Sequence, residues 1–214
     1  MRHLVLCMLS CAAVFTVQAE VAREWHFDDV RPGELPSGWI AAKTCQGPGS
    51  AWQVVEDATA PSSGNVLAQT SSAGPNALFN LCLAGDTDQR DVDLSVKFKA
   101  LKGANDQGGG LVWRYQDADN YYVARANPLE DNFRVYKVVN GKRTQLESAD
   151  VKTSVGAWHT LRVVHMGDRM ACFLDGKQYL AAKDGAFQRA GKVGLWTKSD
   201  AVTSFDDLTL RAAR

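Results

Sequence analysis

The sequence predicts an all-β protein, a two-sheet antiparallel β-sandwich of the jelly-roll type. Apolar and polar residues alternate with period two in short runs from Glu24 onward, which is the pattern of strands that bury one face. The dipeptides Asn140-Gly141 and Asp175-Gly176 separate neighbouring runs and suit the positive φ angles of two-residue hairpins. Amphipathic helical periodicity is nearly absent. Many short strands without crossover helices indicate two packed antiparallel sheets.

The expected strands follow one another at short intervals. In the run 91–100, alternate residues from Val92 to Phe98 are apolar, which predicts a strand with one buried face. The Pro- and Gly-rich segment 28–39 predicts a loop that leads into the sandwich. The other strands are predicted over residues 52–56, 65–69, 77–82, 111–115, 120–126, 133–139, 143–147, 158–166, 169–174, 177–182, 192–197 and 203–211.

Residues 1–19 have the order of a secretory signal peptide. A basic start is followed by an apolar run from Leu4 to Val17 and by the small residue Ala19, after which we expect cleavage. The run is shorter than the ~20 apolar residues of a membrane-spanning helix. A lipoprotein signal with Cys11 as the acylated residue is the alternative. We expect residues 20–214 to form one domain, located in the periplasm or secreted.

The charge balance argues against two classes of partner. The chain has 24 lysines plus arginines and 24 aspartates plus glutamates, so its formal net charge at pH 7 is zero. Nucleic acid or an anionic membrane surface would call for a surplus of basic groups. We therefore expect neither partner, and no run after the leader predicts a transmembrane segment.

Three cysteines remain after the expected cleavage, namely Cys45, Cys82 and Cys172. An oxidising compartment permits one disulfide among them. We favour a bridge between Cys45 and Cys82, because both lie in the loop-rich N-terminal third. Cys172 alternates with Met170 and Leu174, as a small core residue would. No close cysteine pair or ligand helix supports a zinc site.

The stretch 110–129, GLVWRYQDADNYYVARANPL, concentrates aromatic, guanidinium and amide side chains in one predicted hairpin. With a loop at 116–119, Trp113 pairs with Tyr122, and both share a core-facing side with Tyr115. The opposite, open face then carries Arg114, Tyr121, Arg125 and Asn127.

That open face has two interpretations. Rings beside planar hydrogen-bond donors are what a sugar requires, because a pyranose offers an apolar C–H face and a ring of hydroxyls. Tyr136 from the next strand and Trp196 from the strand 192–197 could join it. In the alternative interpretation, Arg114 and Arg125 pair with nearby acids such as Glu130, a common fate of charges on strands.

Four stretches carry a resemblance to a known superfamily. They are WHFDD with PGELPSGW near the start, DQGGGLVWRYQDADNYYVARAN, WHTLRVVHMGDRMACFLDGKQ, and GKVGLWTKSDAVTSFDDLTL. Their order resembles the concanavalin A-like lectins and glucanases, and within them the laminin-G-like domains of the 3-keto-disaccharide hydrolase type. The resemblance implies a jelly roll that binds its ligands on the concave sheet.

The resemblance and the open face together lead to a functional hypothesis. We expect carbohydrate or a glycosylated partner to bind on the concave sheet, and the family type implies glycoside hydrolysis. Cleavage needs a pair of carboxyl groups, but the Glu-x-Asp-x-x-Glu motif of the resembling glucanases is absent, and DVD at 91–93 and LEDN at 129–132 are the nearest approaches to it. Glu130 and Asp131, next to the aromatic hairpin, are the candidate catalytic residues. A non-catalytic structural or protein-interaction domain of the cell envelope is the alternative. The expected ligand contacts are Arg114, Tyr121, Arg125, Asn127, Tyr136 and Trp196.

Paired aspartates near the two ends of the chain form a second candidate site. They lie in WHFDD at 25–29 and in SFDDLTL at 204–210. In the resembling sandwiches the first and last strands lie together with a calcium ion between them, which makes Asp28 and Asp207 candidate ligands. The alternative is that these aspartates end strands in solvent. No cofactor is expected to be required.

Overall fold

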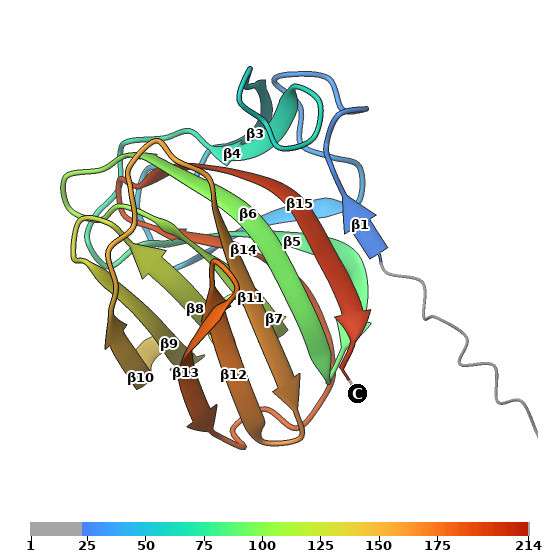
Figure 1. The fold of residues 1–214 in the computed structure, drawn as a ribbon, viewed down its shortest axis with the longest axis vertical. Coiled ribbons are helices and arrows are strands. Elements are labelled where there is room, and N and C mark those ends of the chain that lie inside the picture. The colour runs from blue at the N-terminus through green and yellow to red at the C-terminus, as the bar shows by residue number, and fades with distance from the viewer. Residues whose placement is uncertain (1–22, 214) are drawn as a thin grey trace, which may run out of the picture.

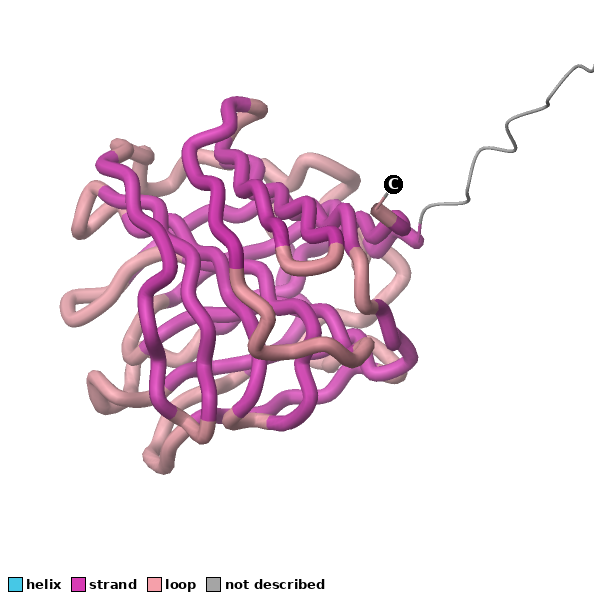
Figure 2. The backbone as a smooth tube through the Cα atoms, turned by 90° about the horizontal axis from the view of Figure 1, so that it is seen from below, coloured by secondary structure: helices cyan, strands magenta, loops and turns pink. Residues whose placement is uncertain are grey.

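The computed structural model describes residues 23–213, which form two antiparallel sheets packed face to face (Figure 1). Strands and loops account for all of these residues (Figure 2). Within them, no helix is long and apolar enough to cross a membrane. Sheet A contains β1 (Arg23–Trp25), β3 (Trp52–Glu56), β4 (Asn65–Gln69), β6 (Val92–Lys102), β11 (His159–Met166), β12 (Arg169–Leu174), β13 (Lys177–Lys183) and β15 (Val202–Ala212). Sheet B contains β2 (Trp39–Thr44), β5 (Phe79–Gln89), β7 (Gly109–Asp117), β8 (Asn120–Asn127), β9 (Asn132–Val139), β10 (Lys142–Asp150) and β14 (Gly191–Lys198).

Strands that are consecutive in the sequence are distributed over the two sheets. Sheet A runs β13-β12-β11-β6-β15-β4-β3, with β1 added alongside β15, and sheet B runs β10-β9-β8-β7-β14-β5-β2. The predicted all-β sandwich is confirmed, and every predicted strand has a counterpart. Two strands, β1 and β2, fall where the sequence predicted no strand. In β2 the buried residues do not alternate, so period two gives no signal there. Residues 1–22, with the predicted signal peptide and Cys11, lie outside the described residues.

The core between the sheets is centred on aromatic side chains of the 110–129 hairpin. Trp113 and Tyr122 pair across β7 and β8, and their rings stack with centroids 5.6 Å apart. Trp113 Nε1 donates a hydrogen bond to Nδ1 of His165 on sheet A, at 2.8 Å. All three residues are fully buried. This contact joins the two sheets and leaves His165 neutral, since its Nδ1 acts as the acceptor.

A β-bulge in β7 changes the predicted division of faces. The register shifts between Trp113 and Asp117, and Arg114 has a positive φ of 47° within this segment. Extra residues in one strand reverse the alternation beyond the bulge. Tyr115 therefore lies on the outer face and stacks on Tyr121, with ring centroids 6.1 Å apart. The prediction that Tyr115 faces the core was wrong for this reason.

Sheet B curves strongly around its outer face, the face turned away from sheet A. Arg143 on β10 and Phe79 on β5 are five strand positions apart, which in a flat sheet would be about 24 Å. Instead, the guanidinium carbon of Arg143 lies 5.0 Å from the Phe79 ring centre. Thr44 of β2 likewise reaches Tyr121 of β8, with 2.7 Å between the hydroxyl oxygens. The outer face of sheet B is therefore concave.

The predicted disulfide between Cys45 and Cys82 is not formed, and Cys45, Cys82 and Cys172 are all free. Cys45 is exposed just beyond the end of β2, whereas Cys82 is fully buried between the sheets. Proximity in the sequence suggested the bridge, but strand alternation turns Cys82 inward. Burial raises the pKa of the Cys172 thiol to about 12 and also raises the pKa of the Cys82 thiol. Both core thiols are therefore expected to be unreactive in the folded protein.

We expect a thiol reagent to modify Cys45 rapidly in the native protein, and Cys82 and Cys172 only after unfolding. The reason is accessibility, because a buried thiol with a raised pKa provides little thiolate. Peptide mapping by mass spectrometry after native and denatured labelling measures each residue separately. A peptide that joins Cys45 to Cys82 without reductant would contradict the structure.

The buried imidazole of His165 predicts a loss of stability in mild acid. Burial and, secondarily, the charge of Arg114 lower its pKa to about 4, against about 6.5 in the unfolded chain. The unfolded state therefore binds the proton first. The free energy of unfolding should fall as the pH drops from 6.5 toward 4, by about 3 kcal/mol from this group. Urea denaturation of wild type and His165→Gln measures the effect, because glutamine keeps an acceptor for Trp113 without titrating. Equal pH slopes in the two proteins would refute it.

Candidate functional site

The concave face of sheet B carries a second apolar cluster that no third layer covers among residues 23–213. Its members alternate with core residues along each strand, and they are nearly all buried by the curvature of the sheet itself. We call this group the outer cluster, and it consists of Phe79, Leu81, Leu83, Val112, Tyr121, Val123, Tyr136, Val138 and Trp196.

The guanidinium of Arg143 lies over the rings of the outer cluster. Its carbon is 4.4 Å from the Tyr136 ring centre, 5.0 Å from Phe79 and 5.8 Å from Trp196. The three rings are at most 7% exposed, whereas Arg143 is half-buried. Cation–π attraction holds the charge there, and burial lowers the pKa of Arg143. The Arg143 guanidinium therefore lies between solvent and the rings of Phe79, Tyr136 and Trp196.

Arg125 lies beside the Tyr136 ring, at the centre of a polar network. Its Nη1 donates to Asn132 Oδ1 at 2.7 Å, and its Nη2 donates to Glu130 Oε2 at 2.9 Å and to the Tyr136 hydroxyl at 3.3 Å. Arg134 also pairs with Glu130, at 3.2 Å. Glycine at position 110 makes room for this side chain, because a Cβ there would lie 2.9 Å from Cβ of Arg125.

A buried ion pair continues the network along β8. Asn127 Nδ2 donates to Asp106 Oδ1 at 3.1 Å, and Lys198 Nζ donates to Asp106 Oδ2 at 2.9 Å. The side-chain oxygen Oδ1 of Asn127 accepts hydrogen bonds from the backbone N–H groups of Leu129 and Glu130. Asn127 and Asp106 are therefore fixed from both sides, which orients the loop that carries Glu130.

Three buried donors on this face have no hydrogen-bond partner among the described residues. They are Nε of Arg125, Nη1 of Arg143 and Nε1 of Trp196, the last of which lies near the Tyr121 hydroxyl but outside hydrogen-bond geometry. A buried unpaired donor costs about 1–3 kcal/mol, so native structures contain few of them. Their presence beside one another, on a face of sheet B that no other described layer covers, marks this surface as one that a polar ligand can complete.

The structure brings together most, but not all, of the predicted contact residues. Arg125, Tyr136 and Trp196 meet on the concave face, and Asn127 adjoins them through the Asp106 network. Tyr121 is in the same cluster, with its hydroxyl bonded to Thr44. Arg114 lies elsewhere, where it is fully buried and satisfied by the carbonyls of Arg90, Gly167 and Phe187 and by Asp91.

Two residues of the site, Arg143 and Asp106, were not predicted from the sequence. A signal for Arg143 was present, since the Asn140-Gly141 turn pairs Val138 with Arg143 across the hairpin and so places both on one face. No comparable signal exists for Asp106, which lies in a loop before β7 and reaches the site only through the folded loop.

The candidate catalytic acids do not form a catalytic pair. Burial alone would raise the pKa of Glu130, but hydrogen bonds from Arg125 and Asn132 and the nearby guanidinium charges lower it to about 2. Glu130 is therefore ionised at neutral pH and cannot act as a general acid. Asp131 is exposed in the turn before β9, with a positive φ of 51°.

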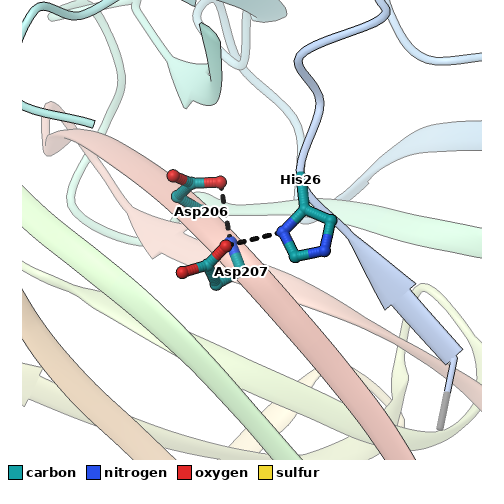
Figure 3. Close-up of side chains that lie close together, drawn as sticks. All are labelled: His26, Asp206 and Asp207. Carbon is teal, nitrogen blue, oxygen red and sulfur yellow. Dashed lines mark hydrogen bonds and ion pairs between the residues drawn. The ribbon is translucent and has the colours of Figure 1, made fainter. Parts of the chain in front are cut away.

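The aspartates of the two chain ends meet on sheet A, but in a different combination from the predicted one. Figure 3 shows His26, Asp206 and Asp207 together. Asp207 accepts from His26 and from Lys97, each at 2.7 Å, and these bonds lower its pKa against the effect of burial. Asp28 instead accepts from the backbone of Ser63 and Asn65.

This cluster does not fit a calcium ion well. Calcium takes about six to eight oxygen ligands, whereas His26 offers nitrogen and Lys97 already neutralises Asp207. The fully buried Asp206 accepts from Ser62 and from the amide of Asp207, and burial raises its pKa. These contacts satisfy the carboxylates without a metal.

An open cleft of 810 Å³ lies apart from the concave face, between residues 24 and 39. Its aromatic residues contact one another edge to face. The centre of the Trp39 ring lies 5.4 Å from that of Phe27 and 6.0 Å from that of Trp25. None of its described residues has a buried polar side-chain atom without a partner. The concave face, with its unpartnered buried donors, therefore carries the stronger indication of a ligand.

Known structures share this fold. Carbohydrate-binding module CBM66 from Bacillus subtilis has a TM-score of 0.66 at 20% identity, covering 82% of this chain and 96% of that chain. The fold is the concanavalin A-like jelly roll. The Bacillus licheniformis β-glucanase gives 0.60 at 11% identity, covering 92% of this chain and all of the other. The exoplasmic/lumenal domain of VIP36, in its Ca²⁺/Man3GlcNAc-bound form, gives 0.55 at 13%, covering 83% and 84%.

Other comparisons gave no match. No family model matches the chain, and no curated protein matches it. The likeness to the solved concanavalin A-like structures is a likeness of fold, since sequence identity with them is 20% or less. The narrower resemblance to laminin-G-like 3-keto-disaccharide hydrolases stays a prediction.

Proposed function

We propose that the protein binds carbohydrate on the concave face of sheet B, beside Arg125, Tyr136, Arg143 and Trp196. The observation that carries this proposal is the group of three buried, unpartnered donors next to aromatic rings. A sugar supplies hydroxyl acceptors for such donors and a C–H face for such rings. Stacking on the rings requires the Arg143 side chain to swing aside, a kind of rearrangement that is common at binding surfaces.

The similar structures add support of a general kind. One of them is a carbohydrate-binding module and another was solved with Man3GlcNAc bound, so this fold is used for glycan binding. Export by the predicted signal peptide would place the face where extracellular glycans occur. We propose binding without hydrolysis, because Arg125 and Arg134 hold Glu130 ionised and no second carboxyl group contacts it among the described residues.

A protein-interaction surface is less well supported by the described residues. Their large exposed apolar side chains are distributed over separate loops and strands instead of one strand face, and contiguous apolar patches are what mark protein partners. These side chains are Ile40, Leu101, Leu129, Val155 and Met166.

A thermal-shift screen against neutral and acidic oligosaccharides tests the proposed site. A ligand that binds only the folded protein raises its melting temperature by mass action, and we expect at least one sugar to do so without any product being released. Arg125→Gln should weaken binding at least tenfold, since a site donor is lost while Arg134 still pairs with Glu130.

The matched control is Arg162→Gln, on the opposite outer face of the sandwich. Arg162 also lies over a ring, 5.2 Å from the centre of Phe173, and pairs with Asp93. This variant should bind as wild type does. Unchanged affinity in a folded Arg125→Gln protein would remove the proposed site, and released product would replace binding with catalysis.

The proposed site on sheet B does not require calcium, and we expect the carboxylates of Asp206 and Asp207 on sheet A to bind none. Because Lys97 and His26 occupy Asp207, neither calcium nor a chelator should change the melting temperature at pH 7. Differential scanning fluorimetry measures the melting temperature with calcium or chelator added at concentrations on the order of millimolar, the range of extracellular calcium sites. A rise with calcium that Asp207→Asn abolishes would establish a metal site here.

A further inference from the structure

Arg143 is exceptional among the arginines that the structure describes. Four of them are buried or half-buried, namely Arg114, Arg125, Arg134 and Arg143. Arg114 pairs with Asp91, and Arg125 and Arg134 both pair with Glu130. Arg143 has no such acid, and its Nη1 is buried with no acceptor at all. Burying a charge without a counter-ion is costly, and the aromatic rings beneath it compensate only in part.

The charges around Arg143 do not supply the missing anion. The network contains four cations, Arg125, Arg134, Arg143 and Lys198, and two carboxylates, Glu130 and Asp106. Both carboxylates are already engaged by other cations. Asp119, an exposed carboxylate at the β7–β8 turn, lies near Tyr115 and Tyr121 of the same face but makes no ion pair with Arg143. With Asp119 included, four cations face three carboxylates, so a surplus of one positive charge remains around Arg143 in a chain whose formal net charge is zero.

From these contacts we infer that the ligand is an acidic oligosaccharide, and that Arg143 binds its carboxylate. The inference rests on the proposed carbohydrate site and names the class of sugar. The planar fork of a guanidinium matches a carboxylate with two parallel hydrogen bonds. A uronate that engages Arg143 also draws the guanidinium away from Tyr136, Phe79 and Trp196, which opens the rings for stacking. Arg143 is in this account the specificity-determining residue.

The test compares uronate oligosaccharides with their carboxyl-reduced forms, which differ only by a neutral hydroxymethyl group in place of each carboxylate. Oligomers of galacturonate, glucuronate and mannuronate are titrated into the protein by calorimetry, each beside its reduced partner. We expect at least one acid to bind tenfold or more tightly than its reduced form, with an affinity that falls as salt is raised.

Three variants assign that preference to one residue. Arg143→Gln should abolish the preference for the acid, Arg143→Lys should retain part of it through charge alone, and Arg162→Gln should leave it unchanged. Melting temperatures show whether each variant is folded, and Arg143→Lys keeps the test valid should Arg143→Gln fail to fold.

The outcomes separate this inference from the proposal beneath it. Equal binding of acidic and reduced sugars, or an acid preference that survives in both Arg143 variants, overturns the inference while the carbohydrate site stands. Preference for a sulfated neutral oligosaccharide over every uronate also overturns it. No binding by any sugar overturns both.

Discussion

The curvature of sheet B around an apolar face of its own is the constraint on which the rest of this structure depends. One face of the sheet packs against sheet A, and the other buries the outer cluster without a third layer. Such a face must be closed by something, because exposed apolar area of this kind is unfavourable in water. Curvature brings β10 across to β5, and Arg143 closes what remains with a cation over three rings. In the proposed function, the residue that completes the fold at this point is also the one that a ligand would meet first.

The contrast between Arg114 and Arg143 separates structure from function. Both arginines are at least half-buried, which is unusual for arginine. Arg114, however, hydrogen-bonds only within the chain. Its guanidinium joins the turn before β6, the β11–β12 turn and the loop before β14 to the bulge in β7. Arg143 makes no ion pair with the described residues and keeps a buried nitrogen unsatisfied. Burial with full satisfaction is typical of a stabilising residue, and burial without it indicates a function.

Sequence reasoning reached the fold because alternation and turn chemistry are local. The pairing of Trp113 with Tyr122 followed from them, as did the meeting of Arg125, Tyr136 and Trp196 on one face. It failed where a single backbone conformation or a long-range contact decides the outcome. The bulge at Arg114 places Tyr115 on the opposite face from the predicted one. No pattern in the sequence predicts a positive φ at an arginine. The free state of Cys45 and Cys82 depends on which way β5 turns its side chains, and the reach of Arg143 to Phe79 depends on curvature, which period two does not encode.

The central claim is that ligand binds on the concave face of sheet B and not in the open cleft between residues 24 and 39. Backbone and arginine side-chain NMR signals, followed while an oligosaccharide that stabilises the protein is titrated in, test this most directly. The account predicts that the largest shifts fall on β8, β9, β10 and β14, and that the side-chain signals of Arg125 and Arg143 move together with the Trp196 indole. Shifts confined to the cleft around Trp25 and Trp39, with the two arginines unmoved, would contradict it.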